Sequence, residues 1–287
     1  MSLETDSNMN EQQSGVSGAS ERKEISSMDY FNNPTLSDVV LRYGKHGERT
    51  FHAHKIMLCS KSRWFRAALT GKFKESSDKE IVLQASADQD PDAIYMMLQF
   101  MYGPDHDPVL KLPWSDTAIE EAKKTNKESL FWLAVAEVGD YYDLPYLLTM
   151  ACFQFDTAFE CYIADILENM PSDGSPDTEG FLAVVKKAYE MPPMLTKYIQ
   201  IPIAGMFRFR FGDKRILRLL KAVSNEYPRF GCDVFCDLLG HAEEPTRELK
   251  VVRVTTCSDC GRACVASLFA NPGFCQFCGN DVSSEAD

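Results

Sequence analysis

The feature that most constrains this chain is an ordered run of β-rich and helical patterns between Leu36 and Gly103. Two short β-rich runs, at residues 39–43 and 50–54, flank the polar turn at residues 44–47. The turn reads Gly-Lys-His-Gly, and glycine-rich turns between two such runs are typical of β-hairpins. The sequence therefore predicts a hairpin near the start of the first folded unit.

Helical spacing follows the hairpin directly, beginning at Lys55. Either Ser60 or Ser62 supplies the hydroxyl expected to cap a second helix. A third β-rich run at residues 80–84 precedes a third helix over residues 90–103, which opens with Asp-Pro and stops at a glycine. The order strand, strand, helix, helix, strand, helix predicts a compact α+β unit.

A set of residues follows at defined spacing, namely Asp38, Phe51, His54, Lys55, Leu58, Ser62 and Phe65, with the strand at 81–83 and the helix end at 100–103. In these residues the chain resembles the BTB (POZ) domain, a small mixed sheet capped by helices. The resemblance implies one such domain over residues 29–159, with a loop insertion at residues 104–128 that departs from the family pattern. It also implies a self-associating, non-enzymatic module for protein–protein contacts.

Histidine and cysteine near the predicted hairpin raise the question of catalysis. His52 and His54 share one strand face, and Cys59 is close in sequence. A Cys–His nucleophile pair lacks an orienting third group here, so we expect His54 to be buried and hydrogen-bonded, paired with Asp38. The chain also lacks the common nucleotide-binding, hydrolase and metalloprotease motifs, and we predict that it is not an enzyme.

A short pattern after the second predicted helix points to a partner. Phe73 and Glu75 match, within the BTB resemblance, the hydrophobe-x-Glu element by which adaptor members contact a cullin scaffold. Phe73 would enter a partner pocket, and Glu75 would fix the orientation through a polar contact. The alternative is that Phe73 only covers the local core.

Composition limits the other classes of partner. The formal net charge of −12 argues against broad binding to nucleic acid or to anionic membranes. No apolar run is long enough to span a bilayer, and the N-terminus does not resemble a signal peptide. We therefore expect a cytoplasmic or nuclear protein whose ten cysteines are thiols or metal ligands. Residues 1–28 are polar and acidic, and we expect them to be disordered.

Residues 160–245 predict an α-helical extension, in the position of the helices that follow many BTB domains. Residues 206–223 are expected to be one of its helices. The stretch Arg208–Lys221 contains six basic residues and one acidic residue, interleaved at its start with phenylalanine. In such a stretch the aromatic rings can stack on bases and the basic side chains can neutralise the phosphates of a nucleic acid. An amphipathic helix with a basic exposed face is the preferred interpretation.

Two matched cysteine pairs lie near the C-terminal end of the sequence. Each reads Cys-x-x-Cys-Gly, and fourteen residues separate the pairs. This spacing is typical of a closed tetrahedral zinc site, so residues 249–282 are predicted to be a zinc-ribbon-like module with one structural zinc ion. The alternative is four ordinary cysteines or a redox pair. The predicted ligands are Cys257, Cys260, Cys275 and Cys278.

Together these features resemble a fungal-type BTB protein with a helical extension and C-terminal cysteine pairs. The leading hypothesis is a homodimeric substrate adaptor for a cullin-based ubiquitin ligase, which holds an unidentified target protein near the ligase. The alternative is a nuclear transcription regulator, dimerised by the BTB domain, whose zinc module or Arg208–Lys221 stretch contacts nucleic acid.

Overall fold

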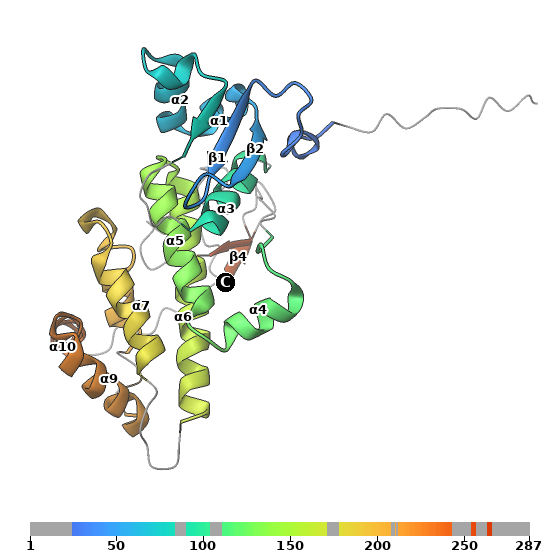
Figure 1. Ribbon diagram of the computed structural model, residues 1–287. Coiled ribbons are helices and arrows are strands. Elements are labelled where there is room, and N and C mark those ends of the chain that lie inside the picture. The colour runs from blue at the N-terminus through green and yellow to red at the C-terminus, as the bar shows by residue number, and fades with distance from the viewer. Residues whose placement is uncertain are drawn as a thin grey trace, which may run out of the picture.

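The computed structural model describes residues 25–83, 90–103, 111–170, 178–207, 210, 212–242, 254–256 and 263–265. A small sheet with its first helices forms one end of the molecule, and a group of helices forms the other (Figure 1). Most of the predicted N-terminal tail lies outside the described residues.

The sheet has three strands, in the order β2-β1-β3. β1 (Val39–Tyr43) pairs antiparallel with β2 (Arg49–Ala53) and parallel with β3 (Glu80–Val82). Gly44 and Gly47 both have positive φ in the turn between β1 and β2, which glycine adopts without steric cost. The hairpin is confirmed, with its second strand one residue earlier than expected, and the sheet is mixed.

Three helices pack on this sheet. α1 and α2 meet at a single residue, and α3 is opened by the Asp90 side chain, which accepts a hydrogen bond from the Asp92 backbone. Nine of the residues of α3 are buried, so this helix is the centre of the N-terminal core. The bounds are Lys55–Lys61 for α1, Arg63–Thr70 for α2 and Pro91–Tyr102 for α3.

The insertion was expected to be a loop with at most one short turn of helix, and it contains a longer helix. Helix α4 (Asp116–Lys123) begins where the Ser115 hydroxyl accepts a hydrogen bond from the Ala118 backbone. Its exposed face is charged, and among the residues of this helix whose burial is described, Ala122 is the buried one. A single small buried side chain leaves no apolar stripe to recognise, and the sequence pattern therefore did not predict two turns of helix.

Helices α5 (Lys127–Tyr141) and α6 (Pro145–Glu168) pack side by side and join the two ends of the molecule (Figure 1). α6 is 24 residues long and has no break at residues 159/160, the predicted boundary between the first domain and the helical extension. One continuous cluster of buried side chains runs from the sheet through these helices into the extension. The two parts therefore share a helix and a core.

The extension consists of α7 and a group of three further helices, α8 to α10. The single helix expected over residues 206–223 is wrong, because α8 ends at Gly205 and Asp213 caps the start of α9. The bounds are Glu179–Glu190 for α7, Gln200–Gly205 for α8, Lys214–Glu226 for α9 and Pro228–Ala242 for α10.

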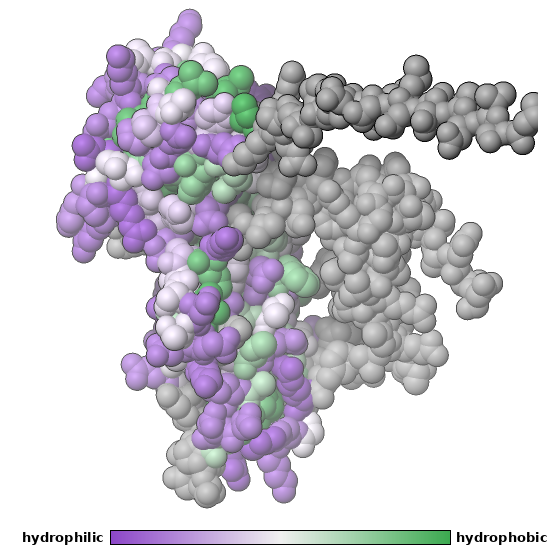
Figure 2. All heavy atoms as spheres, turned by 90° about the vertical axis from the view of Figure 1, so that its right-hand side faces the viewer, coloured by the Kyte–Doolittle hydropathy of each residue, from purple (hydrophilic) through white to green (hydrophobic). Residues whose placement is uncertain are grey.

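The surface is mixed in character. On the face drawn in Figure 2, hydrophobic residues form small separate patches among hydrophilic ones. In the described part of the chain, no helix combines the length and the apolar character that crossing a membrane requires.

Candidate protein-interaction site

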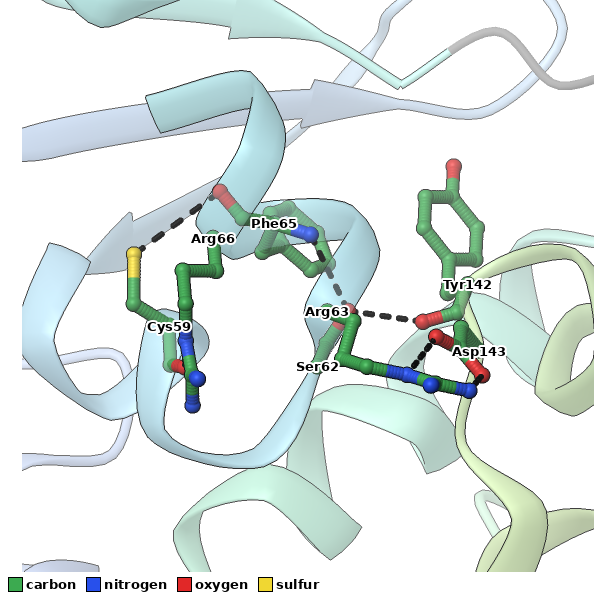
Figure 3. Close-up of polar contacts among 7 residues, drawn as sticks. All are labelled: Cys59, Ser62, Arg63, Phe65, Arg66, Tyr142 and Asp143. Atoms are coloured by element: carbon green, nitrogen blue, oxygen red, sulfur yellow. Dashed lines mark hydrogen bonds and ion pairs between the residues drawn. The ribbon is translucent and has the colours of Figure 1, made fainter. Parts of the chain in front are cut away.

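The candidate interaction site starts from the junction of α1 and α2, which Ser62 holds. Its hydroxyl accepts a hydrogen bond from the Phe65 backbone N–H at 3.0 Å, which caps α2. The same hydroxyl donates to the carbonyl oxygen of Tyr142 at 2.7 Å (Figure 3). Ser62 is fully buried, so one small side chain fixes the start of α2 against the link between α5 and α6.

Arg63, the next residue, adds an ion pair to the same link. Its guanidinium donates to both carboxylate oxygens of Asp143, at 2.5 and 2.9 Å (Figure 3). These hydrogen bonds lower the pKa of the Asp143 carboxyl below its usual value. The pair is exposed and therefore stabilises only weakly, but its two-pronged geometry orients α2.

Aromatic packing completes the attachment of α2. The ring of Phe65 stacks on that of Tyr142, with centroids 5.4 Å apart and planes 12° from parallel. Arg66 donates to the Cys59 carbonyl oxygen at 3.0 Å, and the Cys59 thiol lies 3.7 Å from the Phe65 carbonyl oxygen (Figure 3). Burial raises the pKa of the Cys59 thiol, so this cysteine is poorly suited to act as a nucleophile.

The segment after α2 presents Phe73 to solvent. Its side chain is 61% exposed, so it does not cover the local core. Glu75 lies two residues further, in the short 3₁₀ helix Lys74–Ser76, and is half-buried. Among the described residues, its carboxylate has no hydrogen-bond or ion-pair partner. The segment therefore offers one aromatic ring and one unpaired carboxylate on the same short turn.

Local contacts hold this turn in place. Lys55 donates to the Ser76 carbonyl oxygen at 3.0 Å, and the Ser76 hydroxyl donates to the Phe73 carbonyl oxygen at 2.7 Å. A Cβ added at Gly71 would lie 2.5 Å from the Ala67 carbonyl oxygen and 3.1 Å from the Phe73 ring. Glycine, which has no Cβ, allows the backbone after α2 to pass this close to the Ala67 carbonyl oxygen and the Phe73 ring. The position of the Phe73 ring therefore depends on Gly71.

The pairing of His54 with Asp38 is not formed, which corrects the expectation from the sequence. Asp38 instead accepts the Lys55 backbone N–H at 2.7 Å, at the start of α1. The buried His54 ring lies 2.8 Å from the Tyr102 hydroxyl through Nδ1 and 2.8 Å from the Thr35 carbonyl oxygen through Nε2. A carbonyl can only accept, so Nε2 donates to Thr35, and in a neutral ring Nδ1 then accepts from the Tyr102 hydroxyl. A ring whose two nitrogens are both engaged in this way is structural.

The remaining residues of the BTB pattern lie in the same core. Phe51, Leu58 and Phe65 are completely buried, on β2, α1 and α2 respectively. They lie around the same sheet as His54 and Ser62. The structure thus brings the whole pattern together within one small α+β unit.

The predicted zinc ligands lie outside the described residues. What the structure describes on either side of the first cysteine pair is a hairpin of two strands. β4 (Val254–Thr256) pairs antiparallel with β5 (Ala263–Val265), with Thr256 opposite Ala263. Elsewhere in the described part of the chain, no three His, Cys, Asp or Glu side chains are close enough to hold a metal ion.

The geometry above agrees with comparisons against known proteins. Residues 28–113 match the model of the BTB/POZ domain family. These residues form a BTB/POZ domain, and domains of this class act in protein–protein interaction and generally self-associate. The match includes the strands β1 to β3, the helices α1 to α3 and the segment with Phe73.

One curated relative matches a shorter stretch. Trishanku of Dictyostelium discoideum is 45% identical over 66 residues, which are 23% of this chain. The matched stretch spans only 9% of the length of Trishanku. The similarity therefore covers a short stretch of each chain, and the activity of the whole relative is not carried over to this protein.

Sequence reasoning missed the attachment of α2 to the link between α5 and α6. Arg63, Tyr142 and Asp143 were not among the predicted site residues, although they determine how α2 and the following turn are held. The one signal in this link is Asp143-Leu144-Pro145, which is typical of the start of a helix. Nothing in its composition indicates which residue eighty positions earlier it contacts.

Proposed function

We propose that this protein is a substrate adaptor for a cullin-based ubiquitin ligase, contacting the cullin through Phe73 and Glu75. The observation that carries the proposal is the 61% exposure of Phe73 on a turn held by local hydrogen bonds. An aromatic ring kept in water by a rigid backbone loses little conformational freedom when a partner pocket receives it.

Glu75 supplies the polar half of the same contact. Its carboxylate has no partner among the described residues, so binding does not first have to break an internal ion pair. The protein would perform no bond chemistry. It would raise the effective concentration of a target protein near the ligase, which accelerates transfer by proximity.

Dimerisation through the BTB/POZ domain and a structural zinc ion complete the proposal. The β4–β5 pairing places Thr256 opposite Ala263, and the sequence between them contains Cys257 and Cys260, which supports a zinc-binding turn. Five cysteines in the described part of the chain are free thiols, which supports a reducing location, in the cytosol or the nucleus. Light scattering after size-exclusion chromatography tests the dimer, because it measures the mass of the eluting particle.

The deciding experiment measures binding of the purified full chain to the N-terminal domain of a cullin by biolayer interferometry. We expect Phe73→Ala to weaken binding by about two orders of magnitude, as the loss of a buried aromatic anchor does. Glu75→Ala should weaken it by about tenfold. Exposed Phe153 and Glu226 offer matched controls, and Phe153→Ala and Glu226→Ala should bind like the wild type.

Folding must be the same in all variants, which circular dichroism and the midpoint of thermal unfolding verify. The proposal is wrong if no cullin binds the wild-type chain, or if Phe73→Ala binds as tightly as the Phe153→Ala control. Capture of duplex DNA in place of a cullin would support the nuclear regulator instead.

A further inference from the structure

Helix α9 has a basic stripe on its exposed side. Lys214, Arg218 and Lys221 are all exposed and follow one another at intervals of four and three residues. Side chains at this spacing lie on one face of a helix. The opposite face holds the buried residues Ile216, Leu219, Leu220 and Val223, which fix how α9 is rotated.

These three cations have no ion pair or hydrogen bond in the part of the chain that the structure describes. Other basic residues of the same stretch are already engaged. Arg215 pairs with Asp213 at 2.7 Å and donates to the Leu167 carbonyl oxygen at 3.0 Å, while Arg210 pairs with Glu160 at 3.6 Å. Arg210 and Arg215 thus form ion pairs within the chain, whereas the three cations of the stripe face solvent. They do so although the chain has a net charge of −12.

An apolar side chain lies within the stripe. Leu217 is 42% exposed and falls between Lys214 and Lys221 on the same side of the helix. Cations around an exposed leucine complement a partner that carries carboxylates around an apolar residue.

We infer that this stripe of α9, formed by Lys214, Leu217, Arg218 and Lys221, is a docking surface for an acidic amphipathic peptide of a partner protein. Nucleic acid fits it less well. Three phosphate contacts give weak binding, the chain repels polyanions overall, and the aliphatic Leu217 offers no aromatic ring on which a base can stack.

The inference rests on the proposed function, and it assigns the target class that the adaptor would recruit. Figure 1 shows α9 and α10 at the end of the molecule opposite α1 and α2. A target bound to α9 therefore does not compete for the surface around Phe73. One adaptor can hold both partners at the same time, as an adaptor requires.

The test measures fluorescence anisotropy of a labelled peptide of about twelve residues, in which leucines at helical spacing are surrounded by glutamates. The binding partner is the full chain. We expect the variant Lys214→Glu/Arg218→Glu/Lys221→Glu to bind at least about tenfold more weakly. Leu217→Ala should weaken binding several-fold. Because exposed charges are screened, wild-type affinity should fall as salt rises.

The matched control reverses three exposed lysines elsewhere, Lys45→Glu/Lys124→Glu/Lys186→Glu, which changes the net charge equally. It should keep most of the wild-type affinity. Equal losses in both triple variants, or an unchanged Kd in the α9 variant, would overturn the inference, as would tighter α9-dependent binding of duplex DNA or of a uridine oligomer. Cullin binding by the α9 variant should be intact, so a failure here is distinct from a failure of the adaptor proposal.

Discussion

The Ser62 hydroxyl donates a hydrogen bond to the carbonyl oxygen of Tyr142, 2.7 Å away across eighty residues of sequence. Because the same hydroxyl also caps α2, this contact couples the BTB/POZ domain to the helices that follow it. The turn with Phe73 extends directly from α2. Its position therefore depends on residues far outside the segment that carries the partner-binding pattern.

Replacing Ser62 tests that coupling. Ser62→Ala removes the cap of α2 and leaves the Tyr142 carbonyl without this donor, so we expect a loss of about 2 to 3 kcal/mol in the free energy of unfolding. Urea denaturation followed by circular dichroism measures it. Ser60→Ala is the control, because within the described part of the chain the exposed Ser60 hydroxyl bonds only to the nearby Met57 carbonyl oxygen. An equal effect of the two substitutions would show that the Tyr142 contact contributes nothing.

The close contact of α5 with α6 gives a second prediction. A Cβ at Gly139 would lie 2.9 Å from the Leu148 backbone nitrogen and 3.2 Å from its Cα, so the two helices must separate to admit it. We expect Gly139→Ala to destabilise the chain by about 1 to 3 kcal/mol, although alanine favours helix. Thermal unfolding monitored by circular dichroism is the measurement.

Gly212 provides the matched control for this substitution. A Cβ there would meet no atom within 4 Å, so Gly212→Ala should change the unfolding midpoint little. A wild-type midpoint for Gly139→Ala would mean that α5 and α6 are not packed as closely as the structure describes.

These two sites show what the sequence could and could not predict. Serine before an apolar run predicted a cap, but Ser60 and Ser62 were equally good candidates. Ser62 is the cap, because its hydroxyl accepts from the Phe65 backbone N–H, and it also donates to a carbonyl oxygen of a distant turn. Local chemistry thus predicts which residue types begin and end helices, whereas pairing across the fold depends on tertiary packing.

His54 illustrates the same limit. The sequence predicted a buried, hydrogen-bonded histidine near a strand end, and the side chain is 6% exposed. The predicted partner, Asp38, was wrong. Its carboxylate instead accepts a hydrogen bond from the backbone N–H of Lys55 at the start of α1. Tyr102 takes its place through α3, which crosses beneath the hairpin. Tyr102 is 48 residues from His54 in the sequence, and no local pattern indicates that α3 brings the two together.

Asp156 predicts a pH dependence of stability. This carboxyl lies on α6 between Cys152 and Glu160, one turn away on either side, and its Oδ1 is buried with no hydrogen-bond partner among the described residues. Burial, assisted by the negative charge of Glu160, raises the pKa of Asp156 to about 7. The folded state therefore holds a proton that the unfolded chain releases near pH 4.

Because the folded pKa is the higher one, the contribution of Asp156 to stability is full below about pH 4 and is lost as pH rises to about 7. We expect Asp156→Asn to remove this loss and to be more stable than wild type at pH 8 by on the order of 1 to 3 kcal/mol. Urea denaturation at pH 5 and pH 8 measures it, with Asp165→Asn on the same helix as the control. Parallel pH profiles for Asp156→Asn and wild type would contradict the assignment.

The proposed zinc ion gives the last prediction. Chain purified under reducing conditions and loaded with zinc should contain one ion per chain by mass spectrometry of the metal, because four thiolates close one tetrahedral site. Cys257→Ser and Cys275→Ser should each lose it, since three thiolates and a hydroxyl bind far more weakly. Cys232→Ser is the control, because this exposed thiol on α10 is outside both pairs.

Chelation of the zinc ion should leave the helical circular dichroism nearly unchanged, because the helices have their own continuous core. Full zinc content in the Cys275→Ser variant would rule out a site that uses both pairs.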